Sequence, residues 1–146
     1  MKKLLLIIAM MALILPLAAC SKKVTDLGDV VDDAARRAFL NDFVYFDFDR
    51  YNIRGDQVPT MDAKAAYLKA TGSSSQLTGY ADERGTEAYN LALGDRRSKS
   101  AANYLVSQGV SSSRLSTDTG GESNPRDPGH NEAAWALNRR VEFTLY

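Results

Sequence analysis

Apolar and polar residues alternate over several short runs of this chain and recur at helical spacing over others. The alternating or aromatic-rich runs predict strands at residues 43–49, 76–80, 114–119 and 140–145. Steps of three and four predict helices from Asp56 to the glycine and serines at 72–75, from Thr86 to about Gln108, and briefly over 132–137. This order predicts an α+β fold, a two-layer sandwich of type β-α-β-α-β-(short α)-β with its helices on one sheet.

Residues at the ends of these runs support the predicted helices. Asp56 is expected to cap the first helix, with Pro59 in its first turn. Thr86 is expected to cap the second helix, and Gly109 to end it. The run at 76–80 is a weak strand, and the stretch Ser73-Ser74-Ser75-Gln76 at its start is polar, so we expect that strand to be short or marginal.

The first 20 residues have the form of a lipoprotein leader. Two lysines precede an apolar run, Leu4 to Leu17, which is shorter than the roughly 20 residues that span a bilayer. The ending Leu17-Ala18-Ala19-Cys20 resembles a bacterial lipobox. We therefore predict a signal peptide at 1–19 and lipidation of Cys20; an ordinary signal peptide with an incidental cysteine is the alternative.

The segment that follows Cys20 is expected to separate the domain from the lipid. Residues 20–42 lack a strand pattern, and their thin apolar stripe favours at most a weak helix. We predict a flexible tether at 20–42 and one domain at 43–146. By resemblance to lipoproteins of Gram-negative bacteria, Ser21 after the cysteine implies sorting to the outer membrane, facing the periplasm.

Composition and charge exclude several classes of function. Basic and acidic residues number 18 each, and removing the leader with its two lysines leaves 16 basic residues against 18 acidic ones. This balance argues against a nucleic-acid partner. His130 is the only histidine, which argues against a histidine-based metal site or a catalytic triad.

The candidate site consists of an acidic residue in a loop and a basic residue on the helix that follows. Asp82 lies in a glycine-bracketed loop before the helix, and Arg97 lies on the helix face that also carries Asn90 and Leu93. The carboxylate suits an ammonium group and the guanidinium suits a carboxylate, so the pair suits a zwitterion. Glycines 79, 85 and 94 would let a ligand approach the backbone. A structural ion pair of Asp82 with Arg97 or with neighbours is the alternative.

Three segments together resemble a known family. They are GYADERGTEAYNLALGDRRS at 79–98, VYFDFDRYNIR at 44–54 and GHNEAAWALNRRVEF at 129–143, and they resemble the OmpA-like peptidoglycan-binding domain. Within that family the similarity is strongest to the lipoproteins of the Tol-Pal system. The resemblance implies non-covalent binding of the peptide stem of peptidoglycan, chiefly its meso-diaminopimelate. Implied ligand contacts are Asp82, Arg97, Asp47, Phe48, Asp49, Arg84 and Leu93, with Asn90 and Arg140 in support.

The leading hypothesis is a non-enzymatic module that tethers the outer membrane to the cell wall and supports envelope integrity and cell division. The resemblance implies a Tol-type periplasmic protein as a competing partner, and no cofactor or metal is expected. One alternative is a glycosidase that uses two carboxylates among Asp47, Asp49, Asp82 and Glu83. The other is a structural lipoprotein without ligand binding, because Tyr80 and Asp47 depart from the family pattern.

Overall fold

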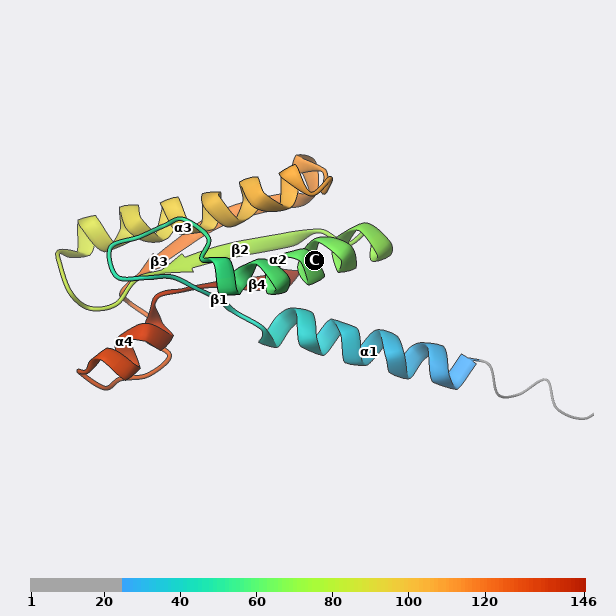
Figure 1. Ribbon diagram of the computed structural model, residues 1–146, viewed down its shortest axis with the longest axis horizontal. Coiled ribbons are helices and arrows are strands. Elements are labelled where there is room, and N and C mark those ends of the chain that lie inside the picture. The colour runs from blue at the N-terminus through green and yellow to red at the C-terminus, as the bar shows by residue number, and fades with distance from the viewer. Residues whose placement is uncertain (1–24) are drawn as a thin grey trace, which may run out of the picture. The chain divides into compact units, whose positions relative to one another are not determined.

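The computed structural model describes residues 25–146 (Figure 1). The predicted signal peptide at 1–19 and Cys20 lie outside the described residues. Residues 33–146 form one compact unit, which contains every strand described below. Over residues 25–146, no helix has the length and apolar character needed to cross a membrane.

Four strands form one mixed sheet in the order β1-β4-β2-β3. Strand β2 is parallel to β3 and antiparallel to β4, which is also antiparallel to β1. The strands are β1 Val44–Tyr45, β2 Ser75–Tyr80, β3 Leu115–Gly121 and β4 Arg140–Leu145; the helices are α1 Thr25–Asn41, α2 Val58–Thr71, α3 Glu87–Ser107 and α4 Glu132–Asn138, with 3-10 turns η2 Gly55–Gln57 and η3 Ser112–Arg114.

The core lies between one face of this sheet and helices α2 and α3. Leu77 and Phe143 from the sheet pack with Met61 and Leu68 of α2 and Leu105 of α3, all at most 2% exposed. Polar residues such as those at 76, 78 and 144 alternate with the buried positions. These contacts confirm the predicted two-layer α+β sandwich.

The first and second strands differ from the prediction. The first spans only two residues, because the backbone turns after Phe46, with a bond from the Arg50 amide to the Asp47 carbonyl (3.2 Å) and a left-handed Asp49 at φ 56°. The second is neither short nor marginal. It lies between β4 and β3, and backbone pairing on both sides holds all six residues in the strand despite polar Ser75 and Gln76 and the glycine at 79.

Helix ends follow the predictions with one exception. The Thr86 hydroxyl accepts from the Tyr89 amide at 3.2 Å and caps α3, and Gly109 follows the helix at φ 90°. The predicted cap at Asp56 is wrong. Gln57 holds the N-cap position of α2 without a side-chain bond, and Asp56 instead pairs with Arg54 at 2.8 Å.

The predicted tether ends earlier than Asn41-Asp42. Helix α1 continues through Asn41, and Phe39 is 4% exposed within the core. Its ring stacks on Tyr67 at 4.8 Å between centroids and meets the edge of Phe143 at 5.8 Å. The apolar positions near the end of this segment are therefore part of the domain, a correction to the boundary predicted at residue 42.

A lysine lies inside this core. Lys64 of α2 is 2% exposed, and its ammonium lies over the rings of Phe143 (4.2 Å) and Phe39 (4.5 Å) while donating to the Phe39 carbonyl. Burial lowers the pKa of this amine from 10.5 to about 7, although Asp42 acts in the opposite direction. A charged Lys64 therefore costs folding free energy.

We expect Lys64→Met to change the pH dependence of stability. Between pH 7 and 10 the unfolded chain keeps a proton that folded Lys64 releases, so wild-type stability rises with pH by up to about 1.4 kcal/mol per pH unit through this group. The variant lacks this contribution. Its stability relative to wild type is therefore highest at pH 7 and below and declines toward pH 10. Urea titrations at pH 6 to 10 measure the difference, and parallel profiles would contradict the expectation.

Candidate functional site

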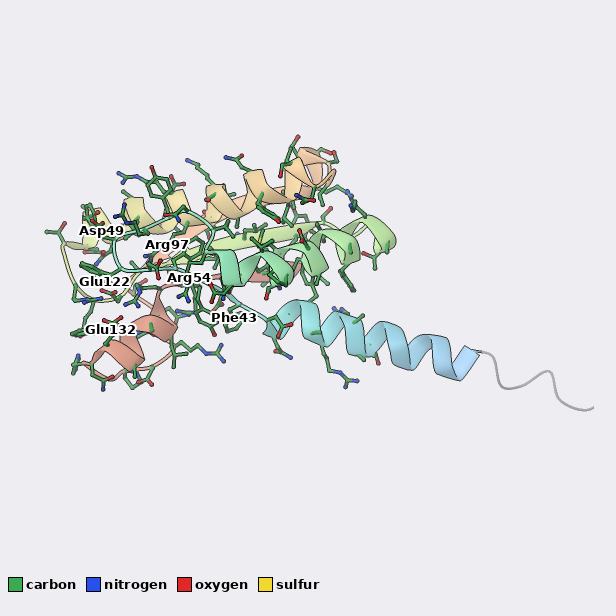
Figure 2. All side chains as sticks on the ribbon, in the orientation of Figure 1. Phe43, Asp49, Arg54, Arg97, Glu122 and Glu132 are labelled. Atoms are coloured by element: carbon green, nitrogen blue, oxygen red, sulfur yellow. The ribbon has the colours of Figure 1, made fainter. Side chains whose placement is uncertain are left out.

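A cavity of about 230 Å³ lies between the loop after β1, the loop after β2 and the first half of α3. Figure 2 shows Asp49 from the first of these loops next to Arg97 from α3. The cavity brings together most of the residues predicted for the site. Its lining consists of Phe48, Asp49, Ala81, Asp82, Arg84, Gly85, Tyr89, Asn90, Leu93 and Arg97.

Asp82 is buried and already paired with two arginines. One carboxylate oxygen accepts from the Arg84 amide (3.1 Å) and Nε (3.0 Å), and the other accepts from Arg84 Nη2 (2.8 Å) and Arg139 Nη1 (3.3 Å). Burial acts to raise the pKa of the Asp82 carboxyl, but the hydrogen bonds from Arg84 and Arg139 outweigh it and keep the pKa below its ordinary value. Asp82 is therefore an anion at neutral pH.

Arg97 is fully buried and bonds to three backbone carbonyls in two segments, the loop after β1 and the end of β2. Its guanidinium donates to the carbonyls of Arg50 (2.8 Å), Tyr80 (2.8 Å) and Asp47 (3.0 Å). Burial lowers its pKa to about 10, so it stays charged at neutral pH. Of the predicted alternative, the direct Asp82–Arg97 pair is absent, whereas the pairing of Asp82 with neighbouring arginines is present. Each group has other partners. Three of the five N–H groups of Arg97 donate to the carbonyls, which leaves two further donors.

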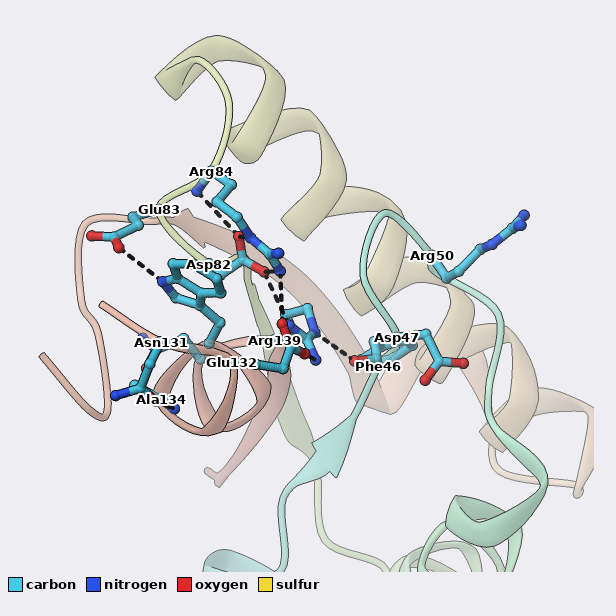
Figure 3. A network of polar contacts seen from close by, with 12 residues as sticks. Phe46, Asp47, Arg50, Asp82, Glu83, Arg84, Asn131, Glu132, Ala134 and Arg139 are labelled. Atoms are coloured by element: carbon cyan, nitrogen blue, oxygen red, sulfur yellow. Dashed lines mark hydrogen bonds and ion pairs between the residues drawn. The ribbon is translucent and has the colours of Figure 1, made fainter. Parts of the chain in front are cut away.

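Arg84 covers one side of the cavity. Its guanidinium stacks between Phe48 (4.0 Å) and Trp135 (4.2 Å) while pairing with Asp82. Figure 3 shows this arginine above Asp82, with Arg139 and Glu132 below it. Arg84 Nη2 also lies 3.5 Å from the Glu132 carboxylate. Since the Arg84 side chain is still 30% exposed, it can leave the carboxylate without unpacking the core.

A second carboxylate faces the cavity beside α3. Asp49, in its left-handed conformation, accepts a hydrogen bond from the Tyr89 hydroxyl, which raises the pKa of that phenol. Asn90 donates to Glu122 from the loop after β3, so it supports the wall rather than offering its amide to the cavity. Leu93 supplies apolar surface.

Two predicted residues lie outside the cavity lining. The Asp47 side chain is exposed and pairs with Arg54 at 3.5 Å, so only its backbone carbonyl belongs to the site. Arg140 is 2% exposed, stacks on Tyr80 at 4.1 Å and pairs with Glu142 at 2.7 Å. These contacts give Arg140 a structural role, which fits the supporting role predicted for it. Tyr80 points into this stack and does not shape the rim beside Asp82.

Two of the three glycines, Gly79 and Gly94, do not line the cavity, whereas Gly85 does. Gly79 of β2 and Gly94 of α3 face each other, and a Cβ atom on Gly79 would lie 1.9 Å from the Gly94 carbonyl oxygen. They permit close packing of the helix on the strand. Gly85 has φ 118° in the loop that leads into α3, which is a backbone conformation that other residues rarely adopt.

Sequence reasoning missed residues that complete the site. Arg139 is 5% exposed and joins the Phe46 carbonyl (3.0 Å), Asp82 and Glu132 (2.7 Å). It belongs to the Asn-Arg-Arg motif, but sequence alone does not show which of the two arginines is nearer to Asp82. Trp135 and Tyr89 were also missed, since their contacts with Arg84 and Asp49 join segments far apart in the chain.

Asp82 and Glu83 do not have the raised pKa that a glycosidase general acid requires. The pKa of Asp82 is lowered, and hydrogen bonds from His130 and Trp135 lower that of Glu83. Among the described residues, histidine, cysteine and acidic side chains form no cluster of three that could hold a metal ion. The arrangement suits binding of a small charged ligand.

The chain is similar to known proteins both in sequence and in structure. The OmpA family matches residues 45–139. A peptidoglycan-associated lipoprotein of Pasteurella multocida is 42% identical over 149 residues, and the match covers 97% of each chain. A peptidoglycan-associated lipoprotein of Pseudomonas aeruginosa is 43% identical over 116 residues, and the match covers 80% of this chain and 68% of that protein. The crystal structure of the peptidoglycan-associated lipoprotein from Burkholderia pseudomallei aligns with a TM-score of 0.69 at 36% identity, covering 71% of this chain and 89% of that one.

Proposed function

The chain belongs to the OmpA family, and on this premise we propose that it binds peptidoglycan non-covalently through the cavity beside α3. The observation that carries the proposal is the presence of two carboxylates and two arginines around one small cavity with an apolar wall. The names of its relatives, peptidoglycan-associated lipoproteins, support the same ligand. Binding, rather than bond cleavage, is the proposed activity.

The ligand group is the zwitterionic end of meso-diaminopimelate in the peptide stem. The remaining donors of Arg97 and the free edge of Arg84 suit its carboxylate. The Asp49 carboxylate and Asp82, once Arg84 swings away, suit its ammonium group. Leu93 and Phe48 cover the methylene chain between the charged groups. Each charge on the ligand then has a partner of opposite sign in a partly desolvated cavity.

The proposed role combines this binding with a lipid anchor. We place acylated Cys20 in the outer membrane and the domain on its periplasmic side, so that the chain tethers the membrane to the wall. Several acyl chains at about 0.8 kcal/mol per buried methylene hold such an anchor durably. A Tol-type periplasmic protein is the proposed competing partner, with roles in envelope integrity and cell division.

We expect Asp82→Asn to reduce peptidoglycan binding by at least about tenfold, the equivalent of roughly 1.4 kcal/mol. The amide keeps the shape of the side chain but removes the charge that faces the ligand ammonium. Co-sedimentation of the full-length protein in detergent with diaminopimelate-containing peptidoglycan measures the loss. Trp135 is the only tryptophan and stacks on Arg84, so its fluorescence reports occupation of the cavity by soluble stem peptides.

Asp118→Asn is the matched control, because Asp118 is an exposed acid of β3 that does not line the cavity. Circular dichroism verifies that both variants are folded. Wild-type protein that fails to sediment with peptidoglycan would favour a structural lipoprotein without ligand binding. Release of soluble fragments from peptidoglycan would instead favour the glycosidase, and equal binding by Asp82→Asn would place the ligand elsewhere.

A further inference from the structure

A second, open hollow of about 340 Å³ lies farther along α3. Its lining consists of Tyr51, Arg96, Lys99, Ser100 and Asn103. Two elements border both the cavity and this hollow, namely α3 and the loop that follows β1. The hollow therefore lies next to the proposed binding site, on the same helix and the same loop.

The residues along the helix wall form a single stripe. Tyr89 and Leu93 of the cavity are followed by Arg96, Ser100 and Asn103 of the hollow, at successive steps of four, three, four and three. At 1.5 Å per residue, Arg96 lies about 5 Å and Lys99 about 9 Å beyond Leu93 along the helix axis. An extended peptide covers that length with about two or three residues.

The hollow is positively charged. Within the described part of the chain, the side chain of Arg96 makes no hydrogen bond or ion pair, and Lys99 has only an exposed pair with Asp95 at 2.8 Å. Arg50, next to Tyr51 in the sequence, points away from the Asp82–Arg139 network in Figure 3. Tyr51 is 50% exposed and offers a flat apolar surface beside these charges. Such a surface suits a short peptide that ends in an anion.

We propose that this hollow is a second subsite, which binds the free terminal carboxylate of the stem peptide whose diaminopimelate occupies the first cavity. The proposal rests on the proposed function. Arg96 and Lys99 bind the carboxylate, and Tyr51 contacts the residues before it. A stem peptide whose last carboxyl is joined to a neighbouring peptide by an amide bond lacks this anion. The protein therefore prefers stem peptides with a free end.

The test measures three ligands by isothermal titration calorimetry at low salt. They are free meso-diaminopimelate, a synthetic stem peptide with two alanines after the diaminopimelate and a free last carboxyl, and the same peptide with that carboxyl amidated. We expect full-length wild type to bind the free-carboxyl peptide about threefold to tenfold more tightly than the amide. Arg96→Gln with Lys99→Gln removes this preference and leaves the affinity for free diaminopimelate within about twofold of wild type.

Arg36→Gln with Arg37→Gln is the control, since it removes the same charge from exposed positions on α1 and should keep the preference. If wild type binds both peptides equally, or if the Arg96/Lys99 variant keeps the preference, the second subsite is overturned while the proposed function stands. If wild type binds none of the three ligands, the proposed function fails and the subsite fails with it. The pattern of binding thus separates the two failures.

Discussion

Replacing Gly79 with alanine lowers the free energy of unfolding by about 4 kcal/mol or more, because the added methyl group collides with backbone rather than with a side chain that can move. The new Cβ would lie 1.9 Å from the Gly94 carbonyl oxygen and 3.1 Å from the Ser98 amide. Relief requires α3 to lift from β2, which unpacks Leu93 and Ala101. Urea denaturation followed by circular dichroism measures the loss.

Gly55→Ala is the matched control for this substitution. A Cβ atom at Gly55 meets nothing within 4 Å, and its φ is not positive. We expect its stability to stay within about 0.5 kcal/mol of wild type. If Gly79→Ala were as stable as Gly55→Ala, the close approach of α3 to β2 would not constrain the fold.

We expect Arg97→Met to lose about 3–6 kcal/mol of stability. Methionine fills much of the same volume but leaves the carbonyls of Asp47, Arg50 and Tyr80 without their donors. A buried group costs about 1–3 kcal/mol, and the part-buried carbonyls of Asp47 and Arg50 lie toward the lower end of that range. The loop that carries Asp47 and Arg50 should also open. Thermal denaturation measures the stability, and limited proteolysis at residues 46–54 reports the loop.

Arg96→Met provides the control, since Arg96 is the exposed neighbour of Arg97 on α3. Its stability should remain within about 0.5 kcal/mol of wild type. Arg97→Lys should recover only part of the loss, because one ammonium cannot reach three carbonyls in the geometry of the planar guanidinium. Full stability of Arg97→Met would show that the three carbonyls find water or other donors without cost.

The buried position of Arg97 changes how a loss of ligand binding should be interpreted. A folded domain needs this guanidinium to join the loop after β1 to the end of β2. Loss of binding in an Arg97 variant therefore does not by itself identify a ligand contact. Asp82 and Arg84 are better probes, because Arg84 is partly exposed and Asp82→Asn keeps the packing of the loop.

The sequence predicted the features that depend on local patterns. The periodicity of α3 places Asn90, Leu93 and Arg97 on one face, and the structure buries that face. Thr86 and Gly109 mark the ends of this helix because capping depends on residues within one turn. The two-layer sheet also follows from the order of the elements. The motif around Asp82 was sufficient to indicate the region of the cavity.

Only the tertiary structure decided which groups pair with one another. Asp82 pairs with Arg139, which is 57 residues away, and Arg97 bonds to carbonyls 47 and 50 residues away, so no local pattern reveals these partners. The same holds for Phe39, whose place in the core depends on α1 packing against α2. Side-chain spacing fixes which residues share a face. The packing of distant elements decides whether a charge on that face meets a ligand, another charge or the backbone.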